Sequence, residues 1–388
     1  MNTKQKRKVC VITGTRAEYG LLKSVMHAIQ KSENLTLQLL VSGMHLSSDF
    51  GFTEKYISDD GFLINARVPM LADNDSLMSM ADSIGKGICG MARAFKKLKP
   101  DIVLVLGDRV EALSGALAAA YSGIYVAHIH GGDSAEAGLD ENARHAITKI
   151  AHIHFPATPK SAERIERMGE DALRIFMVGA PGLDEVVSKK FKNKEGIAEL
   201  YHLDLSNPSM LVVQHPVSTE SKHAARQMEE TLKAIVQLRL QTIVVFPNAD
   251  AGGRSMISLI KRYARSQSFI KIYPSVPRTD YLGLLNTVDV LVGNSSSGII
   301  ESAVFYLPVV DIGTRQRGRE HSANVLHVGY RCDEITEAIQ KALTDSIFLN
   351  RVKKSKNVYG SGGVGEKIAH VLSSITLDYT LLQKKITY

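Results

Sequence analysis

The chain contains no tryptophan, only three cysteines, and no apolar run long enough to cross a membrane. Cys10, Cys89 and Cys332 lie far apart and are odd in number, which argues against a disulfide framework and a CxxC metal site. The apolar run Val9–Thr13, which follows a basic start, is too short for a signal peptide. These absences predict a cytoplasmic protein without a membrane partner.

Basic charge is not gathered into one region, although the chain carries a formal net charge of +7. Apart from Lys4–Lys8, which we expect to be a solvated tail, the basic residues are scattered, and no nucleic-acid reader motif appears. We therefore expect no nucleic-acid partner, whereas the net charge suits an anionic substrate. With 388 residues, 44% of them hydrophobic, the chain can form two domains with large cores.

Short β-branched runs alternate with longer amphipathic segments along the chain. The alternation occurs twice, which predicts an α/β fold of two doubly wound, Rossmann-like domains facing each other across a cleft. We place their boundary between residues 180 and 181. The predicted strands are Val9–Thr13, Thr36–Val41, Leu63–Val68, Ile102–Leu106, Tyr125–His130, His154–Ala157, Ile175–Val178, Met210–Gln214, Thr242–Pro247, Phe269–Tyr273, Val288–Val292, Val309–Ile312 and Val325–Val328.

The segment GNSSSGIIES, Gly293–Ser302, offers a phosphate site at the end of a predicted strand. Ser295 and Ser296 stand where a helix begins, and its unpaired backbone N–H groups and dipole favour an anion. Glu301 follows one turn later and can accept a hydrogen bond from a ribose hydroxyl. The alternative interpretation is a serine that only caps the helix.

Two other strand ends carry charged candidates. Arg16 lies in the turn of ITGTRAEYG, where its guanidinium can bind a phosphate in bidentate fashion. The alternative is a solvated turn arginine. Asp108 and Arg109 follow the buried strand at 102–106, at the edge of a parallel sheet where ligands bind. Asp108 is either an acid or base at the cleft or the cap of the next helix.

The densest polar cluster begins with HIHGGD. His128 and His130 alternate along a strand, so we expect them to face the same side. Asp133, Asp140 and Glu141 follow before the next helix, and they are candidates for acid–base work. The alternatives are a core histidine for His128 and a helix cap for Asp140.

A zinc site is the main competitor at this cluster, because an HxH pair on a strand can chelate the metal. It would need further ligands, which His152, His154 or the nearby carboxylates could supply. We expect no metal here.

His215 follows the first strand of the second half, in VVQHPVSTES, and is expected to face the cleft from the opposite side. A buried structural histidine is the alternative. The segment GSGGVG at 360–365 has the spacing of a dinucleotide fingerprint, but no strong strand leads into it and too little chain follows. We therefore expect no redox cofactor.

Several short motifs occur one after another between residue 13 and about residue 330. They are TGTRAEYG, SGMHL, LGDR, HIHGGD, ARHAITKIAH, VQHP, FPNADAG, GNSSSGIIE and GTRQRGRE. In this set and order the chain resembles the hydrolysing UDP-N-acetylglucosamine 2-epimerases, especially the branch that supplies sialic and legionaminic acid pathways. The resemblance implies a fold of the glycosyltransferase-B type, with a nucleotide-binding domain at 181–365 and a C-terminal helix at 366–388 that returns to the first domain (1–180).

The resemblance also implies a reaction in which UDP-GlcNAc and water give ManNAc and UDP. A base removes the C2 hydrogen while UDP leaves from C1, and water then adds to the resulting glycal. The new C2 hydrogen arrives on the opposite face, so acid–base groups are needed on both faces of the sugar. Donors must stabilise the charge on the departing diphosphate. No cofactor is implied.

The residue roles carried over are of two kinds. The catalytic positions implied are Asp108, Asp140 with Glu141 adjacent, and His215 near the leaving diphosphate. Many relatives have Glu where this chain has His130, so either His130 or Asp133 replaces that group. The nucleotide contacts implied are Arg16, Arg109, Ser295, Ser296, Glu301 and Arg315.

Other hypotheses share the same motifs. One is the same chemistry on UDP-N,N'-diacetylbacillosamine, a 2,4-diacetamido-2,4,6-trideoxyhexose nucleotide that leads to legionaminic acid. Another is a glycosyltransferase of the same fold, which would leave the sugar C2 untouched. A third is a non-catalytic nucleotide-sugar sensor. In each case a UDP-sugar is the small-molecule partner, and relatives imply a homodimer or homotetramer.

Overall fold

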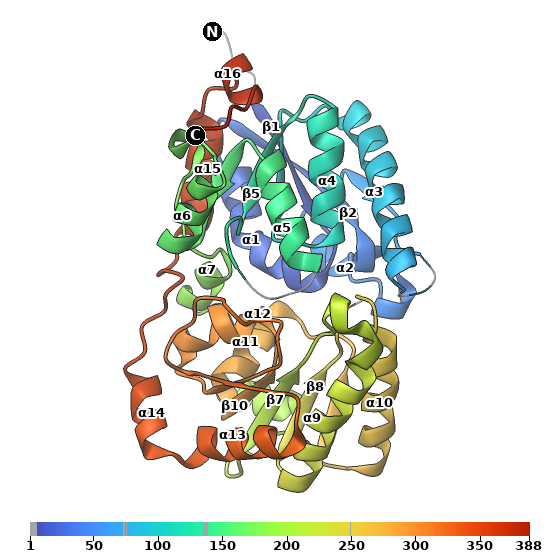
Figure 1. Cartoon of the computed structure of the whole chain (residues 1–388), viewed down its shortest axis with the longest axis vertical. Helices are drawn as coiled ribbons and strands as arrows, with labels where there is room; N and C mark the ends of the chain where they lie inside the picture. The colour runs from blue at the N-terminus through green and yellow to red at the C-terminus, as the bar shows by residue number, and fades with distance from the viewer. Residues whose placement is uncertain (1–5, 73, 75, 135–138, 249) are drawn as a thin grey trace.

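The computed structural model describes residues 6–72, 74, 76–134, 139–248 and 250–388. These residues form two six-stranded sheets in which every neighbouring pair of strands is parallel. Figure 1 shows the N-terminal sheet with its helices above the C-terminal one. The predicted α/β fold of two doubly wound domains is therefore confirmed.

The first sheet has the strand order β3-β2-β1-β4-β5-β6, and the second has the order β12-β11-β10-β7-β8-β9. The strands of the first are β1 (Arg7–Thr13), β2 (Leu35–Ser42), β3 (Ala66–Val68), β4 (Ile102–Leu106), β5 (Tyr125–Ile129) and β6 (Ile153–Phe155). Those of the second are β7 (Ser209–Val213), β8 (Gln241–Val245), β9 (Ile270–Tyr273), β10 (Val290–Gly293), β11 (Val309–Ile312) and β12 (Val325–Val328).

Helices cover both sheets and form the crossovers between parallel strands. Those of the N-terminal half are α1 (Arg16–Lys31), α2 (Lys55–Asp59), α3 (Leu77–Leu98), α4 (Val110–Tyr121), α5 (Leu139–Ile150) and α6 (Pro159–Arg167). The later ones are α7 (Gly182–Val187), α8 (Lys194–Tyr201), α9 (Ala224–Leu238), α10 (Gly253–Ser266), α11 (Arg278–Thr287), α12 (Ser296–Ile300), α13 (Cys332–Thr344), α14 (Ser346–Lys353), α15 (Val364–Ser374) and α16 (Tyr379–Leu382).

Local sequence explains where these elements begin and end. The strand β4 is apolar at all five positions, and each is buried, as expected for a central parallel strand covered on both faces. The Ser76 side chain caps α3 by accepting from the Ser79 N–H, at 3.2 Å. The helix ends at Leu98, and Lys99, which caps it with a φ of 49°, lies just before Pro100.

The prediction of a strand at Ile175–Val178 is wrong. This segment makes only an isolated bridge, between Ile175 and His154 of β6. The N–H of Phe176 donates to the His154 carbonyl at 2.9 Å, but the return bond would need an N–H from residue 156. That residue is Pro156, which has no N–H, so the ladder cannot continue.

Residues 366–388, predicted as one returning helix, hold the rest of α15, the short α16 and irregular chain. The helix α15 packs against α1 of the first domain. Its start is capped by the Asp184 carboxylate, which accepts from the N–H groups of Val364 and Gly365 at 2.9 and 2.8 Å. In Figure 1 this last part of the chain lies against the N-terminal domain.

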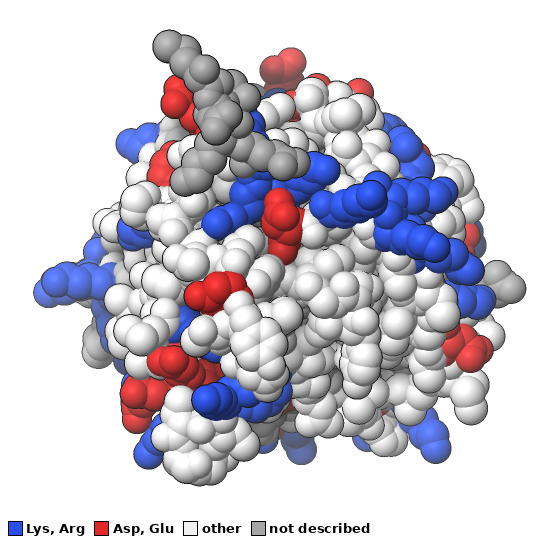
Figure 2. All heavy atoms as spheres, turned by 90° about the horizontal axis from the view of Figure 1, so that it is seen from above, with Lys and Arg blue, Asp and Glu red and all other residues white. Residues whose placement is uncertain are grey.

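Charge is mixed on the face at the N-terminal end of the molecule. Figure 2 shows Lys and Arg side chains there in several separate groups, with Asp and Glu between them. Within the described ranges, none of the helices combines the length and the apolar character that crossing a bilayer requires.

Candidate functional site

A pocket opens between the carboxyl ends of the two sheets, and residues from both domains line it. The predicted site residues that line it are Arg16, Asp108, Arg109, His130, His215, Ser295, Ser296, Glu301 and Arg315. The other three predicted residues, Asp133, Asp140 and Glu141, do not line the pocket, and each contacts an arginine. Strand ends that the sequence analysis singled out in both domains therefore border one pocket.

Asp108 stands at the end of β4, after Gly107, whose φ of 73° allows the sharp turn. Its carboxylate accepts a hydrogen bond from Arg144 of α5, a side chain only 1% exposed. Burial opposes the charge on Asp108, but the guanidinium groups of Arg144 and Arg315 outweigh it and lower the pKa. The helix-cap alternative for Asp108 does not hold, because Arg109 occupies the cap position of α4.

Asp140 and Glu141 lie in the first turn of α5, so Asp140 is inside the helix rather than its cap. The carboxylate of Glu141 binds Arg144 on the same helix. The carboxylate of Asp140 is 3.6 Å from Nη2 of Arg315, which belongs to the opposite domain. Burial, together with the negative charge of Asp108, raises the pKa of Asp140 to about 7, against the effect of Arg315.

The two histidines of HIHGGD do not face the same side, contrary to the prediction. His130 follows the last residue of β5 and has a φ of 63°, which turns it out of the strand. It lines the pocket, whereas His128 is fully buried with Nε2 2.7 Å from the Gly107 carbonyl oxygen. His128 is thus a core histidine. Among the described residues, no group of three or more potential ligands is placed to hold a metal ion.

Asp133 is buried behind His130 and orients it. Its Oδ2 lies 3.0 Å from Nδ1 of His130 and 2.8 Å from Nη2 of Arg319, and its Oδ1 accepts from Ser161 at 2.8 Å. Burial disfavours the carboxylate, but His130 and Arg319 overcome this and lower the Asp133 pKa. The charged carboxylate accepts from Nδ1–H of His130, and in the neutral form of the ring Nε2 is then the acceptor.

His215 follows β7 and reaches the pocket from the second domain. Its Nδ1 accepts a hydrogen bond from the Asn248 backbone N–H at 3.1 Å, so Nε2 carries the proton of the neutral ring. Burial, followed by the charges of Arg315 and Arg109, lowers the His215 pKa well below its ordinary value. The ring is therefore a neutral hydrogen-bond donor.

Arg315 and the serine segment form the polar wall of the second domain. The Ser295 hydroxyl accepts from the Ser297 N–H at 3.4 Å as the cap of α12, so this serine both caps a helix and lines the pocket. One Nη of Arg315 donates to the Asn294 carbonyl at 3.3 Å. Its buried Nε has no hydrogen-bond partner among the described residues. A buried, unsatisfied guanidinium N–H is a donor available to an anion.

Glu301 is 1% exposed and lines the pocket beside the serines. Arg278 donates to both of its carboxylate oxygens, at 3.0 Å in one of the two bonds. Arg278 also donates to the Gly182 carbonyl and to Glu185, at 3.1 Å each, so it joins α7 to the pocket. A carboxylate has about four acceptor positions, which leaves Glu301 able to accept from a ligand as well.

Arg109 is held by two carboxylates. Its Nε lies 3.2 Å from the fully buried Glu111, and its Nη1 lies 3.1 Å from Asp250 of the second domain. A Cβ at Gly43 would overlap the Glu111 carboxylate, which explains the glycine of SGMHL. The paired Arg109 therefore brings little net charge to the pocket.

Arg16 is positioned by contacts from both domains. Its guanidinium carbon lies 3.3 Å from the centre of the Tyr56 ring, and Nη1 donates to the Ser275 hydroxyl at 3.2 Å. The residue is thus part of the pocket wall rather than a solvated turn arginine.

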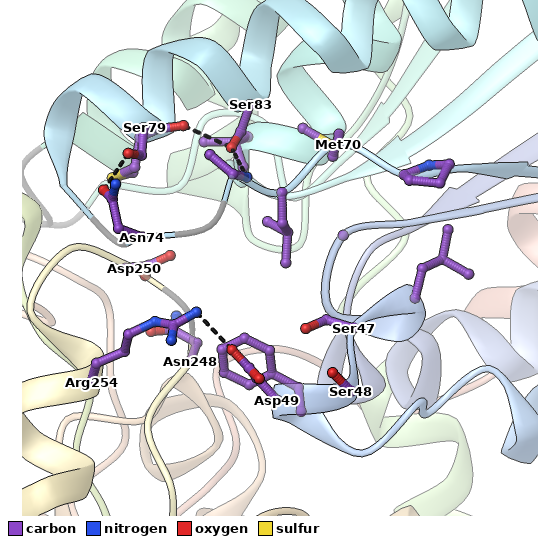
Figure 3. A pocket seen from close by; sticks show the side chains of 18 of the residues that line it. Ser47, Ser48, Asp49, Met70, Asn74, Ser79, Ser83, Asn248, Asp250 and Arg254 are labelled. Carbon is purple, nitrogen blue, oxygen red and sulfur yellow. Dashed lines mark hydrogen bonds and ion pairs between the residues drawn. The ribbon is translucent and has the colours of Figure 1, made fainter.

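A second pocket adjoins the first and shares Phe50, Arg109 and Asn248 with it. Figure 3 shows its polar lining, with Ser79 and Ser83 above and Arg254 below. Arg254 pairs with Asp49 across the two domains at 2.7 Å.

Sequence reasoning missed three arginines that organise the site: Arg144, Arg278 and Arg319. Arg144 follows Asp140 and Glu141 at helical spacing, so the predicted helix could have placed it on their face. Arg319 lies in the motif GTRQRGRE without a local sign of its partner. Nothing in the sequence near Arg278 points to Glu301.

Residues 27–373 match the family model described as UDP-N-acetylglucosamine 2-epimerase. The chain is 38% identical to the UDP-N,N'-diacetylbacillosamine 2-epimerase (hydrolyzing) of Legionella pneumophila, over 98% of this chain and 100% of that protein. It is 34% identical to the UDP-N-acetylglucosamine 2-epimerase of Neisseria meningitidis serogroup B, over 87% of each. The fold resembles the Neisseria meningitidis UDP-GlcNAc 2-epimerase bound to UDP-GlcNAc, with a TM-score of 0.80, 18% identity, and coverage of 94% and 99%.

Proposed function

The chain belongs to the UDP-N-acetylglucosamine 2-epimerase family, and from this premise we propose that it is a hydrolysing 2-epimerase of a UDP-linked 2-acetamido sugar. The reaction proposed first is UDP-GlcNAc plus water giving ManNAc plus UDP. In its first step the C2–H bond and the C1–O bond to UDP both break, which gives a glycal and UDP. In the second step water supplies a hydroxyl to C1 and a proton to C2.

The observation that carries this proposal is the pair Asp108 and Asp140. The two carboxyls lie close enough to interact, yet the pKa of Asp108 is lowered and that of Asp140 is raised to about 7. Two carboxyls whose pKa values are shifted in opposite directions can be present as a carboxylate and a carboxylic acid at the same pH. We assign Asp140, as the protonated form, to proton donation. Asp108, as the charged form, stabilises positive character at C1.

The group that removes the C2 hydrogen is His130 in this proposal. His130 lines the pocket, and its Nε2 is free to accept because Asp133 binds Nδ1. Asp133 itself does not line the pocket and is bound to Arg319 and Ser161. We therefore assign Asp133 to the orientation of His130, the arrangement that an aspartate has beside a catalytic histidine in hydrolytic triads.

The leaving diphosphate is stabilised by donors of the second domain. The unsatisfied Nε of Arg315, the neutral Nε2–H of His215 and the hydroxyls of Ser295 and Ser296 border the same pocket. Donors that are fixed before the reaction stabilise charge as it develops. Glu301, held by Arg278, is assigned to the ribose hydroxyls.

UDP-N,N'-diacetylbacillosamine is the second candidate substrate. The 38% identity to the Legionella pneumophila enzyme named for that sugar, over the full length of that protein, favours it. The 34% identity to the Neisseria meningitidis enzyme named for UDP-GlcNAc favours the first. The chemistry at C1 and C2 is the same for both sugars.

Incubation of the purified protein in deuterated water with each sugar nucleotide tests the proposal. NMR of the products should show UDP and a free 2-epimerised sugar with deuterium at C2, and the faster of the two reactions identifies the substrate. A sugar moved to an acceptor without deuterium would indicate a glycosyltransferase. Binding without turnover would indicate a sensor.

We also propose that the enzyme works in the cytoplasm as a homodimer or homotetramer and supplies sialic or legionaminic acid synthesis. The free thiols of Cys10, Cys89 and Cys332 suit a reducing compartment. Sedimentation of the purified protein tests the oligomeric state. The domain boundary at 180/181 likewise stays a prediction, and limited proteolysis around α7 tests it.

A further inference from the structure

The C-terminal end of α5 is closed by a side chain from the far end of the chain. Helix ends leave carbonyl groups without partners, and a cation there is favourable. The ammonium group of Lys384 donates to the carbonyls of Lys149 and Ala151, each at 2.7 Å, and lies 3.4 Å from that of Thr148. Lys384 therefore caps a helix that ends more than two hundred residues earlier in the chain.

A buried carboxylate completes this cap. Glu170 is 1% exposed, and its Oε2 lies 2.6 Å from Nζ of Lys384 and 3.2 Å from Nε2 of His154. Its Oε1 lies 2.6 Å from Nζ of Lys149, which is itself part of α5. Glu170 thus joins the tail, the end of α5 and β6 through one carboxylate. If the ammonium of Lys384 were removed, the buried carboxylate of Glu170 would lose one of its positively charged partners.

The tail that carries Lys384 is fixed at several points. Arg174 donates to the carbonyls of Thr380 and Leu381, at 2.6 and 2.8 Å. The Tyr125 hydroxyl donates to the Asp378 carbonyl at 2.9 Å, and the buried Leu381 packs into the core of the first domain. The segment that carries Lys384 is therefore fixed by specific contacts with the first domain. A lysine on a loose surface segment near a helix end would lack such contacts.

The opposite end of α5 is the catalytic one. Asp140 and Glu141 occupy its first turn, and Arg144, one turn on, binds Asp108. We propose that Lys384 is a positioning residue for the 2-epimerase reaction: by holding the carbonyl end of α5, it keeps Asp140 and Arg144 in register with the pocket. The inference rests on the proposed function. The match to the family model ends at residue 373, so Lys384 lies beyond the matched segment.

Three variants separate this role from a general loss of stability. Lys384→Met keeps the aliphatic stem but removes the charge, whereas Lys384→Arg keeps a cation that can bind carbonyls. Lys385→Met, at the exposed neighbouring residue, is the matched control. For each variant kcat, KM, UDP affinity and amide hydrogen exchange of α5 are measured on the full chain.

For Lys384→Met we expect kcat to fall about tenfold, the scale of a small misplacement of catalytic groups. We expect KM and UDP affinity to stay within about twofold, because the diphosphate and ribose contacts assigned above lie on the other domain. Amide exchange in the last turn of α5 should accelerate. Lys384→Arg should restore most of kcat, and Lys385→Met should behave as the wild type.

Unchanged kcat in Lys384→Met would overturn the proposal, whether or not exchange changed. Loss of kcat and UDP binding together, with no rescue by Lys384→Arg, would also overturn it, because the residue would then be needed only for folding. Failure of the proposed function is distinguishable. In that case the wild type turns over neither sugar nucleotide, and exchange at the end of α5 alone shows whether Lys384 holds the helix.

Discussion

Arg319 of the second domain donates to the Asp133 carboxylate of the first domain, with 2.8 Å between Nη2 and Oδ2. Both side chains are largely buried, at 10% and 1% exposed, so this bond forms in a protected place between the domains. Asp133 in turn binds Nδ1 of His130 at the pocket. The second domain therefore acts on the orientation of a histidine in the first.

This chain of contacts predicts that Arg319 and Asp133 act as a unit. Arg319→Met and Asp133→Asn should each lower kcat, and the double variant should be little worse than the poorer single one. Contacting groups typically show coupling of about 0.5–3 kcal/mol in such a cycle. If the free-energy costs of the two single substitutions simply added in the double variant, this would contradict the coupling of Arg319 to His130 through Asp133. The cycle is measured from steady-state rates of the three variants and the wild type.

Asp140→Asn should reduce kcat by about 10²- to 10⁴-fold, because an amide cannot donate the proton that the carboxylic acid supplies. UDP affinity, measured by calorimetry, should remain close to that of the wild type. Asp82→Asn, at an exposed position on α3, is the control for a lost surface charge. A rate near that of the wild type in Asp140→Asn would remove this residue from the mechanism.

The raised pKa of Asp140 gives the pH dependence a definite sign. With a pKa of about 7, the carboxyl is protonated below that pH and loses its proton above it. If the protonated form is the acid, kcat/KM should fall as pH rises through about 7, because kcat/KM reports groups of the free enzyme. The residual activity of Asp140→Asn should lack this fall. A kcat/KM that rises or stays flat over the same range would contradict the assignment.

Ribose and diphosphate contacts can be separated with two ligands. Arg315→Met should weaken UDP binding by about 10- to 100-fold, the scale of a lost hydrogen bond to a charged group, and leave uridine binding unchanged. Glu301→Gln should weaken UDP and uridine by the same factor, because both contain the ribose. Equal losses for both ligands in Arg315→Met would show that it does not bind the diphosphate.

Strands and helices with strong local patterns were predictable from the sequence. The runs at 102–106, 309–312 and 325–328 form β4, β11 and β12 with the predicted bounds, and one of the longer amphipathic segments forms α3. Continuous apolar runs and amphipathic spacing decide these elements locally. The strand expected at Ile175–Val178 does not form, because its pairing with the neighbouring strand would need a backbone N–H that Pro156 lacks.

The site was predictable only in part. Strand ends pointed to Asp108, His130 and His215, because parallel sheets gather their carboxyl ends at one edge. The left-handed backbone of His130 was not predictable, because non-glycine residues rarely adopt it. Arg319 meets the Asp133 carboxylate only after the two domains are placed together, and Arg278 meets Glu301 only after the second domain has folded. No local pattern encodes either contact.

The central claim is that the C2–H bond and the C1–O bond both break and that water completes the sugar. Mass spectrometry of a reaction run in water labelled with both deuterium and oxygen-18 tests this most directly. The account predicts a free 2-epimerised sugar with deuterium at C2 and oxygen-18 at C1, together with UDP that carries no oxygen-18. Oxygen-18 in the diphosphate, or a sugar that retains its original C2 hydrogen, would contradict it.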